Sequence, residues 1–169
     1  MDDLADRLRD AGTALLDLRG ALVAGEPWPL SAVYGTEPEA DWGPHEVLAH
    51  VNEMLPYWVD QLGAVLAADP AGPPPPFGRV ATDADRIGRI AADRALAIDP
   101  LLDQIAVGLE AATTFIAAMS DTDGERIGLH PARGEITIRA SLEPFLVGHV
   151  EGHVAQLREN LARPRSAAR

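Results

Sequence analysis

The chain has 169 residues, of which 47% are hydrophobic and 24% are charged. This length suits a single globular domain, and this composition excludes an intrinsically disordered chain. The 26 acidic residues outnumber the 14 basic ones and give a net charge of -12. Such a field repels phosphates and anionic lipid headgroups, so we expect no nucleic-acid partner.

The absence of cysteine narrows the chemistry further. It excludes disulfides, thiolate zinc clusters and a cysteine nucleophile, so any metal must be held by histidine and oxygen ligands. No run approaches the roughly 18 consecutive apolar residues of a membrane span, and the opening residues MDDLADRLRD lack the pattern of a secretory signal. We therefore expect a cytoplasmic protein that does not enter a membrane.

Apolar residues recur at helical spacing in much of the chain. The predicted helices cover about residues 2–24, 44–68, 83–124 and 139–162. Gly43 and Pro44 fit the N-cap and first position of the second helix, and Thr82 is the expected cap of the third. Asp99-Pro100 is the expected kink or break within the third helical region.

Three segments between the helices differ in character. Residues 25–43 are rich in glycine and proline and predict a long loop. The run DPAGPPPPFG at 69–78 predicts a stiff connector, because consecutive prolines can neither continue a helix nor donate to a sheet. Residues 125–138 contain the only alternating pattern and indicate a short extended piece or hairpin.

These elements predict an all-α protein, a four-helix bundle with a short extended piece before the last helix. We expect one domain over residues 1–162 and a flexible C-terminal tail over 163–169. The long connections leave the order of the helices in the bundle open.

Two histidines occupy the predicted apolar face of the last helix, His149 and His153. Residues four apart lie on one side of a helix with Cβ atoms about 5–6 Å apart, which suits two ligands of one metal ion. The alternative is a pair of core or interface histidines, each satisfied by a carboxylate. A shared cation would satisfy one ring nitrogen of each at once.

A third ligand is available on the second helix, where His50 lies at the edge of the apolar arc. The alternative interpretation is that His50 binds no metal and lies half-exposed at the edge of the core, beside Glu46 and Glu53. His45, in the first turn of that helix, is better explained as a solvated side chain. Glu151, between the two histidines of the last helix, points away from the apolar arc and is not assigned as a base.

The segment WGPHEVLAHV at 42–51, followed by HPARGEIT at 130–137 and HVEGHVAQL at 149–157, resembles the DinB/YfiT-like superfamily of metalloenzymes. The resemblance covers nearly the whole chain. It implies a bundle with helices in the order up-down-down-up, commonly dimeric, so a homodimer is an expectation. It also implies a divalent metal, most often zinc or nickel, bound by His50, His149 and His153.

Other residues are candidates for the surroundings of this site, and no catalytic residue is assigned. Gln156 matches the glutamine of the family pattern and is either a hydrogen-bonding neighbour of the site or a surface amide. His130 lies in a loop that could cover the site and contact substrate. Glu46 and Glu53 are ambiguous candidates for the same surroundings.

Three neutral imidazoles leave a divalent cation charged and open to a further ligand, which lowers the pKa of a bound water toward about 7. Such a site can act on a small molecule by hydrolysis or by activating a thiol. The resemblance favours a thiol-dependent S-transferase or isomerase that uses a low-molecular-weight thiol such as mycothiol or bacillithiol, although hydrolytic relatives exist. The alternative is a non-catalytic metal-binding or stress-associated bundle.

Overall fold

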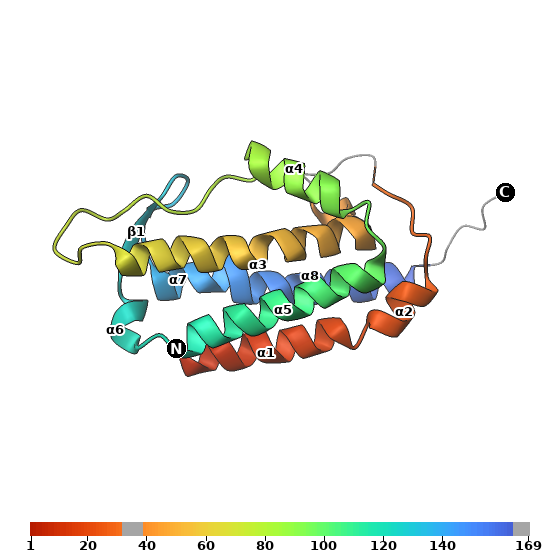
Figure 1. Ribbon diagram of the computed structural model, residues 1–169, viewed down its shortest axis with the longest axis horizontal. Helices are drawn as coiled ribbons and strands as arrows, with labels where there is room; N and C mark the ends of the chain where they lie inside the picture. Colours follow the sequence, from red (N-terminus) through yellow and green to blue (C-terminus); the bar gives the residue numbers. More distant parts are fainter. Residues whose placement is uncertain (32–38, 164–169) are drawn as a thin grey trace.

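The computed structural model describes residues 1–31 and 39–163. Its long helices are α1 (Asp2–Leu16), α3 (Pro44–Ala67), α5 (Ile98–Ala117) and α8 (Gly148–Ala162). In Figure 1, α1 and α8 run in one direction, and α3 and α5 run in the other. Helix α3 packs on α5 and α8, and α1 packs on the same two helices. The predicted all-α class is therefore confirmed, with one small sheet added.

The core lies between these helices and consists of aliphatic side chains. Fully buried examples are Leu8 and Leu15 of α1, Leu48 and Leu55 of α3, Leu101 and Ile105 of α5, and Leu157 of α8. Burial of each such side chain contributes about 1.5–3 kcal/mol relative to exposure. Within the described part of the chain, no helix combines the length and hydrophobicity that a membrane span requires.

The first predicted helix is interrupted. It divides into α1 and a short helix α2 (Arg19–Ala24). At the junction the Leu18 N–H donates to the Leu15 carbonyl at 3.1 Å, a tighter turn than an α-helix makes. The prediction of one helix over 2–24 is therefore wrong in this detail. The predicted loop at 25–43 and the predicted tail at 163–169 lie partly outside the described residues.

Helix α3 begins as predicted, with Gly43 in an extended conformation at the N-cap and Pro44 in the first turn. It continues through Pro56, whose ring lies on the exposed face. The helix is buried on every side near its start, from Pro44 to Val51.

The third helical region breaks earlier than predicted. Helix α4 (Ala84–Asp93) ends before residues 94–97, and Pro100 lies in the first turn of α5. Proline is tolerated there because first-turn N–H groups have no partner within the helix. The cap is also displaced by one residue, since the carboxylate of Asp83, and not Thr82, accepts the Arg86 N–H at 2.9 Å.

A short helix α6 (Asp121–Gly124) follows α5 and leads into an antiparallel hairpin of β1 (Ile127–His130) and β2 (Gly134–Thr137). The predicted hairpin is therefore confirmed. The connector after α3 joins it, because Pro76 forms an isolated parallel bridge with Leu129. Figure 1 shows this hairpin beside the C-terminal end of α3.

The last predicted helix contains a π-helical turn. It consists of α7 (Ile138–Leu142), the turn η2 (Glu143–Val147) and α8. The Gly148 N–H donates to the Glu143 carbonyl five residues earlier. A Cβ atom at Gly148 would lie 2.7 Å from that carbonyl oxygen, so the turn requires glycine at this position.

We expect Gly148→Ala to lower the free energy of unfolding by about 1–3 kcal/mol, because the added methyl group must displace backbone. Gly152→Ala is the matched control, since nothing lies within 4 Å of a Cβ there. It should be neutral or stabilising by up to about 1 kcal/mol, as alanine is the better helix former. Urea unfolding of the metal-free proteins measures the free energy of unfolding of each variant. Equal values for the two variants would contradict the claim that the π-helical turn requires glycine at position 148.

A candidate metal centre

Three histidine side chains converge between α3 and α8. His50 comes from α3, and His149 and His153 lie one turn apart on α8. The Nε2 atoms of His50 and His149 are 2.9 Å apart. The ring centroid of His153 lies 5.2 Å from that of His50 and 4.6 Å from that of His149.

A carboxylate completes the group. Glu39 lies in the short 3-10 helix η1 (Glu39–Asp41), and its Oε2 is 3.9 Å from Nε2 of His149. One ligand atom from each of the four residues lies within 4.8 Å of the others. In a tetrahedral zinc site, ligand atoms at about 2.0–2.1 Å from the metal are about 3.3 Å from one another. Small side-chain movements would therefore bring these atoms to bonding positions.

The surroundings keep the imidazoles neutral. Burial lowers the pKa of His50 well below its usual value, and the neighbouring His153 and His149 lower it further. Burial, with His153 and Arg86, lowers the pKa of His149 to about 3. Burial also lowers the pKa of His153, although its hydrogen bond to Gln156 opposes the shift. Neutral imidazole is the form that binds metal ions.

Gln156 fixes the orientation and tautomer of His153. Its amide nitrogen donates to the backbone carbonyl of Glu39 at 2.6 Å, and a carbonyl can only accept. The amide oxygen therefore faces His153 and accepts from Nδ1–H at 3.0 Å. With its proton on Nδ1, neutral His153 presents the lone pair of Nε2 to the centre of the group.

The Nε2 atom of His153 shows whether a metal ion would suit this site. Nε2 of His153 is buried and has no hydrogen-bond partner among the described residues. A buried nitrogen without a partner is unfavourable, and a cation would satisfy it together with the two neighbouring imidazoles. The residues of this group therefore fit a divalent metal ion.

The carboxylates predicted near the site differ in their positions. Oε2 of Glu53 lies 3.8 Å from Nδ1 of His50, on the side of the ring away from His149. Burial raises the pKa of Glu53, and Arg79 acts in the opposite direction. Glu46 is fully buried, but it accepts from Arg94 and from the Ser31 N–H, both at 2.9 Å. Glu46 therefore ties the preceding segment to α3 and is not part of the group.

Three further residues, the candidate His130 and the unassigned His45 and Glu151, lie outside the group. His130 stacks on the ring of Phe145, with centroids 4.8 Å apart, at the hairpin. His45 is only 8% exposed, so the prediction of a solvated ring is wrong, because the first turns of α3 are covered on every side. Glu151 bonds to Arg7 at 2.7 Å, away from the histidines.

Sequence reasoning missed Glu39 and Arg86. Arg86 is 4% exposed, belongs to α4 and forms an ion pair with Oε1 of Glu39. The pairing leaves Oε2 of Glu39 turned toward His149. The side chains of Glu39 and His149 are 22% and 30% exposed, so this is the open side of the group. Glu39 lies in a segment without helical or strand periodicity, so no pattern linked it to the histidines.

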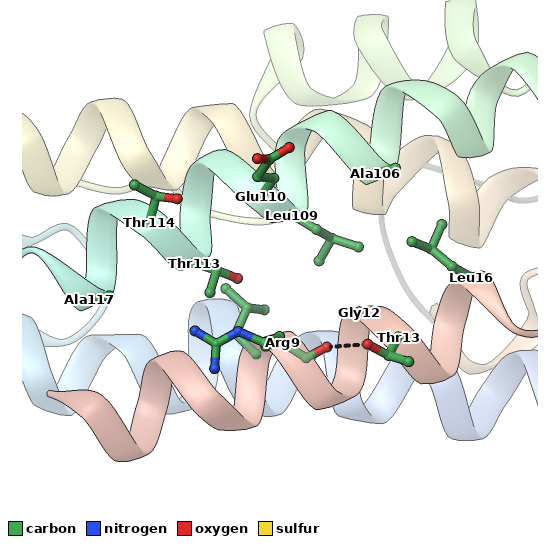
Figure 2. Close-up of a pocket in the computed structure, with 11 residues that line it drawn as sticks. Arg9, Gly12, Thr13, Leu16, Ala106, Leu109, Glu110, Thr113, Thr114 and Ala117 are labelled. Atoms are coloured by element: carbon green, nitrogen blue, oxygen red, sulfur yellow. Dashed lines mark hydrogen bonds between the residues drawn. The ribbon is translucent and has the colours of Figure 1, made fainter.

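A cavity of about 410 Å³ lies elsewhere, between α1 and α5. Its lining consists of Leu8, Arg9, Gly12, Thr13, Leu16, Ala106, Leu109, Glu110, Thr113, Thr114 and Ala117. Figure 2 shows Leu109 between the two helices, with Arg9 and Thr13 along α1. No member of the histidine group lines this cavity, so it is separate from the candidate metal centre.

The fold and this group define a helical protein with a candidate histidine and glutamate metal site. The family model of the DinB superfamily matches residues 2–157, and the chain therefore belongs to the DinB superfamily. No curated protein matches the chain, and no solved structure matches it.

The stability of the metal-free protein should fall as the pH decreases below about 6.5. The three histidines have lower pKa values in the folded chain than in the unfolded one, so the unfolded chain binds more protons in this range. Urea unfolding at several pH values between about 7.5 and 5 measures the slope.

The variant His149→Asn is compared with the wild type. It lacks one of the three titrating groups, so its free energy of unfolding should depend less steeply on pH. A wild-type protein equally stable across this range would show that the buried imidazoles do not resist protonation.

Proposed function

We propose that this protein is a metal-dependent enzyme of the DinB type, in which His50, His149 and His153 hold one zinc or nickel ion. The supporting observation is the convergence of three neutral imidazoles, one of which presents a buried and unpartnered Nε2. When bound, the cation supplies Lewis acidity that lowers the pKa of a thiol or water beside it. The substrate class we propose is a small molecule that reacts with a low-molecular-weight thiol such as mycothiol or bacillithiol.

In this proposal the helical arrangement is the four-helix bundle of the family, with α1 and α8 running against α3 and α5. The supporting observations are the packing of each long helix on two others and the directions visible in Figure 1. The arrangement sets His50 on α3 opposite His149 and His153 on α8. Residues 1–162 are proposed as one domain.

Glu39 favours an enzyme over a non-catalytic metal-binding bundle. An enzyme of this kind needs a group that takes a proton from the thiol or water, and no such group could be assigned from the sequence. Oε1 of Glu39 is held by Arg86, while Oε2 faces the histidines on the exposed side of the group. We assign Oε2 of Glu39 as the atom that accepts this proton.

Gln156 and Arg86 restrict the movement of these groups. Gln156 joins the ring of His153 to the backbone of Glu39, so the ligand and the proton acceptor share one support. Arg86 is buried beside them and donates also to the Ala81 carbonyl at 2.9 Å. Fixed groups of this kind reduce the reorganisation needed during a reaction.

Metal content tests the ligand set. We expect His50→Ala, His149→Ala and His153→Ala each to abolish stoichiometric binding, because each removes one of the three imidazole ligands. His45→Ala is the matched control and should keep one ion per chain, since His45 is not a member of the group. Elemental analysis after zinc reconstitution and gel filtration gives the result, and loss of metal in His45→Ala would show that the ligand set is wrong.

Thiol binding tests the reaction class. We expect zinc-loaded protein to bind mycothiol or bacillithiol in isothermal titration calorimetry, and to bind the S-methyl derivative of the same thiol at least about 10-fold more weakly, a difference of 1.4 kcal/mol. When the free thiol binds, its proton should pass through Oε2 of Glu39 to the buffer, where its release can be measured. Equal affinity for both compounds, or none for either, would reject thiol activation.

Glu39→Gln separates the roles within the site. It should keep the metal, because three imidazoles remain, and should bind the thiol only at higher pH than the wild type does. Loss of metal from Glu39→Gln would instead identify Glu39 as a ligand.

A further inference from the structure

The polyproline segment before α4 is fixed to the rest of the protein. The Pro75 carbonyl accepts the Leu129 N–H at 2.8 Å, and the Phe77 N–H donates to the Leu129 carbonyl at 3.1 Å. The side chain of Phe77 is only 3% exposed. This segment, residues 73–78, is therefore more than a spacer between helices.

Gly78 completes the attachment immediately before Arg79. Its φ of 76° suits glycine, and its N–H donates to the side chain of Gln61 at 2.7 Å. A Cβ atom at this position would lie 2.5 Å from the His130 ring, so the backbone lies tightly against that ring. The direction in which Arg79 leaves the segment is therefore set by the hairpin and by α3.

Arg79 reaches back over α3 to Glu53. Its Nη2 lies 2.5 Å from the Glu53 carboxylate, and its guanidinium carbon lies 3.6 Å from the ring centroid of Tyr57. Nη1 is also 3.9 Å from the Asp83 carboxylate. The side chain of Arg79 is 11% exposed and that of Glu53 is 1% exposed, so the ion pair is shielded from solvent.

Glu53 in turn faces the candidate metal centre. Nδ1 of His50 is buried and has no hydrogen-bond partner among the described residues, and Oε2 of Glu53 lies 3.8 Å from it. If His50 binds a metal through Nε2, its remaining proton resides on Nδ1 and needs an acceptor. Glu53 is placed to be this acceptor after a movement of less than about 1 Å.

We infer that Arg79 is a positioning residue for the metal centre, and that it holds the Glu53 carboxylate against His50 and thereby strengthens metal binding. The inference rests on the proposed function, because it concerns the same three-histidine site. It gives the polyproline segment a role, since that segment delivers Arg79 to Glu53. Removing a partner of this kind typically weakens metal affinity by about 10- to 100-fold.

The test is zinc affinity of chelator-stripped full-length protein, measured by competition with a chromophoric chelator. We expect Arg79→Gln to raise the zinc Kd by about 10- to 100-fold and Arg79→Lys, which keeps the charge, to restore most of the affinity. Arg133→Gln is the matched control, because Arg133 also lies over an aromatic ring, 5.5 Å from the centroid of Phe145, but makes no contact with Glu53 or His50 within the described part of the chain. It should leave the zinc Kd unchanged.

A double-mutant cycle separates positioning from a general loss of stability. In the Glu53→Gln background, Arg79→Gln should have little further effect on the zinc Kd, because its effect passes through that carboxylate. An equal effect in both backgrounds would overturn the inference, as would a zinc Kd for Arg79→Gln equal to that of the wild type. If Arg79→Gln does not fold, Glu53→Gln takes its place, and wild-type affinity in Glu53→Gln overturns the inference. Wild-type protein that binds neither zinc nor nickel would overturn both the inference and the proposed function.

Discussion

Convergence of three neutral imidazole rings on one point, with His50 and His153 buried, is the constraint on which the rest of this structure depends. Each ring has two nitrogens that need partners, and Nε2 of His153 and Nδ1 of His50 have none among the described residues. Three polar side chains lie around the histidines, each on a different side. Gln156 takes the outer nitrogen of His153, Glu53 faces the outer nitrogen of His50, and Glu39 lies on the open side. Two arginines hold the two carboxylates, the partly buried Arg79 and the buried Arg86.

The elements that bring these groups together have different origins. The histidines lie on two long helices whose apolar faces already pack in the core, so their positions follow from the burial of leucine and valine around them. Glu39 and Arg86 come from the short helices η1 and α4, and Arg79 comes from the irregular segment before α4. Figure 1 shows α4 alongside α3. The π-helical turn before Gly148 inserts an additional residue just ahead of His149, and such turns are frequent at functional sites. Regular helices thus provide the ligands, and irregular segments provide the groups that orient them.

This division explains what the sequence could predict. Helical periodicity predicted the all-α class and the extent of α3, and the four-residue spacing of His149 and His153 indicated their common face. It could not find Glu39, whose segment has no period, and it placed the break of the third helical region at Asp99-Pro100, later than the observed break between α4 and α5. Glu46 and Glu53 look alike in the sequence because each lies within one turn of His50. Only their arginine partners separate them, since Arg94 holds Glu46 at the segment before α3 and Arg79 holds Glu53 beside His50.

The most direct test of the central claim is an anomalous difference map, recorded at the zinc absorption edge, from crystals of zinc-reconstituted protein. We predict one strong peak per chain, within bonding distance of Nε2 of His50, His149 and His153. The same map will show whether Oε2 of Glu39 lies inside or outside the coordination sphere. A peak at surface carboxylates away from these histidines, or no peak at all, would contradict the claim that the three converging imidazoles form a metal site.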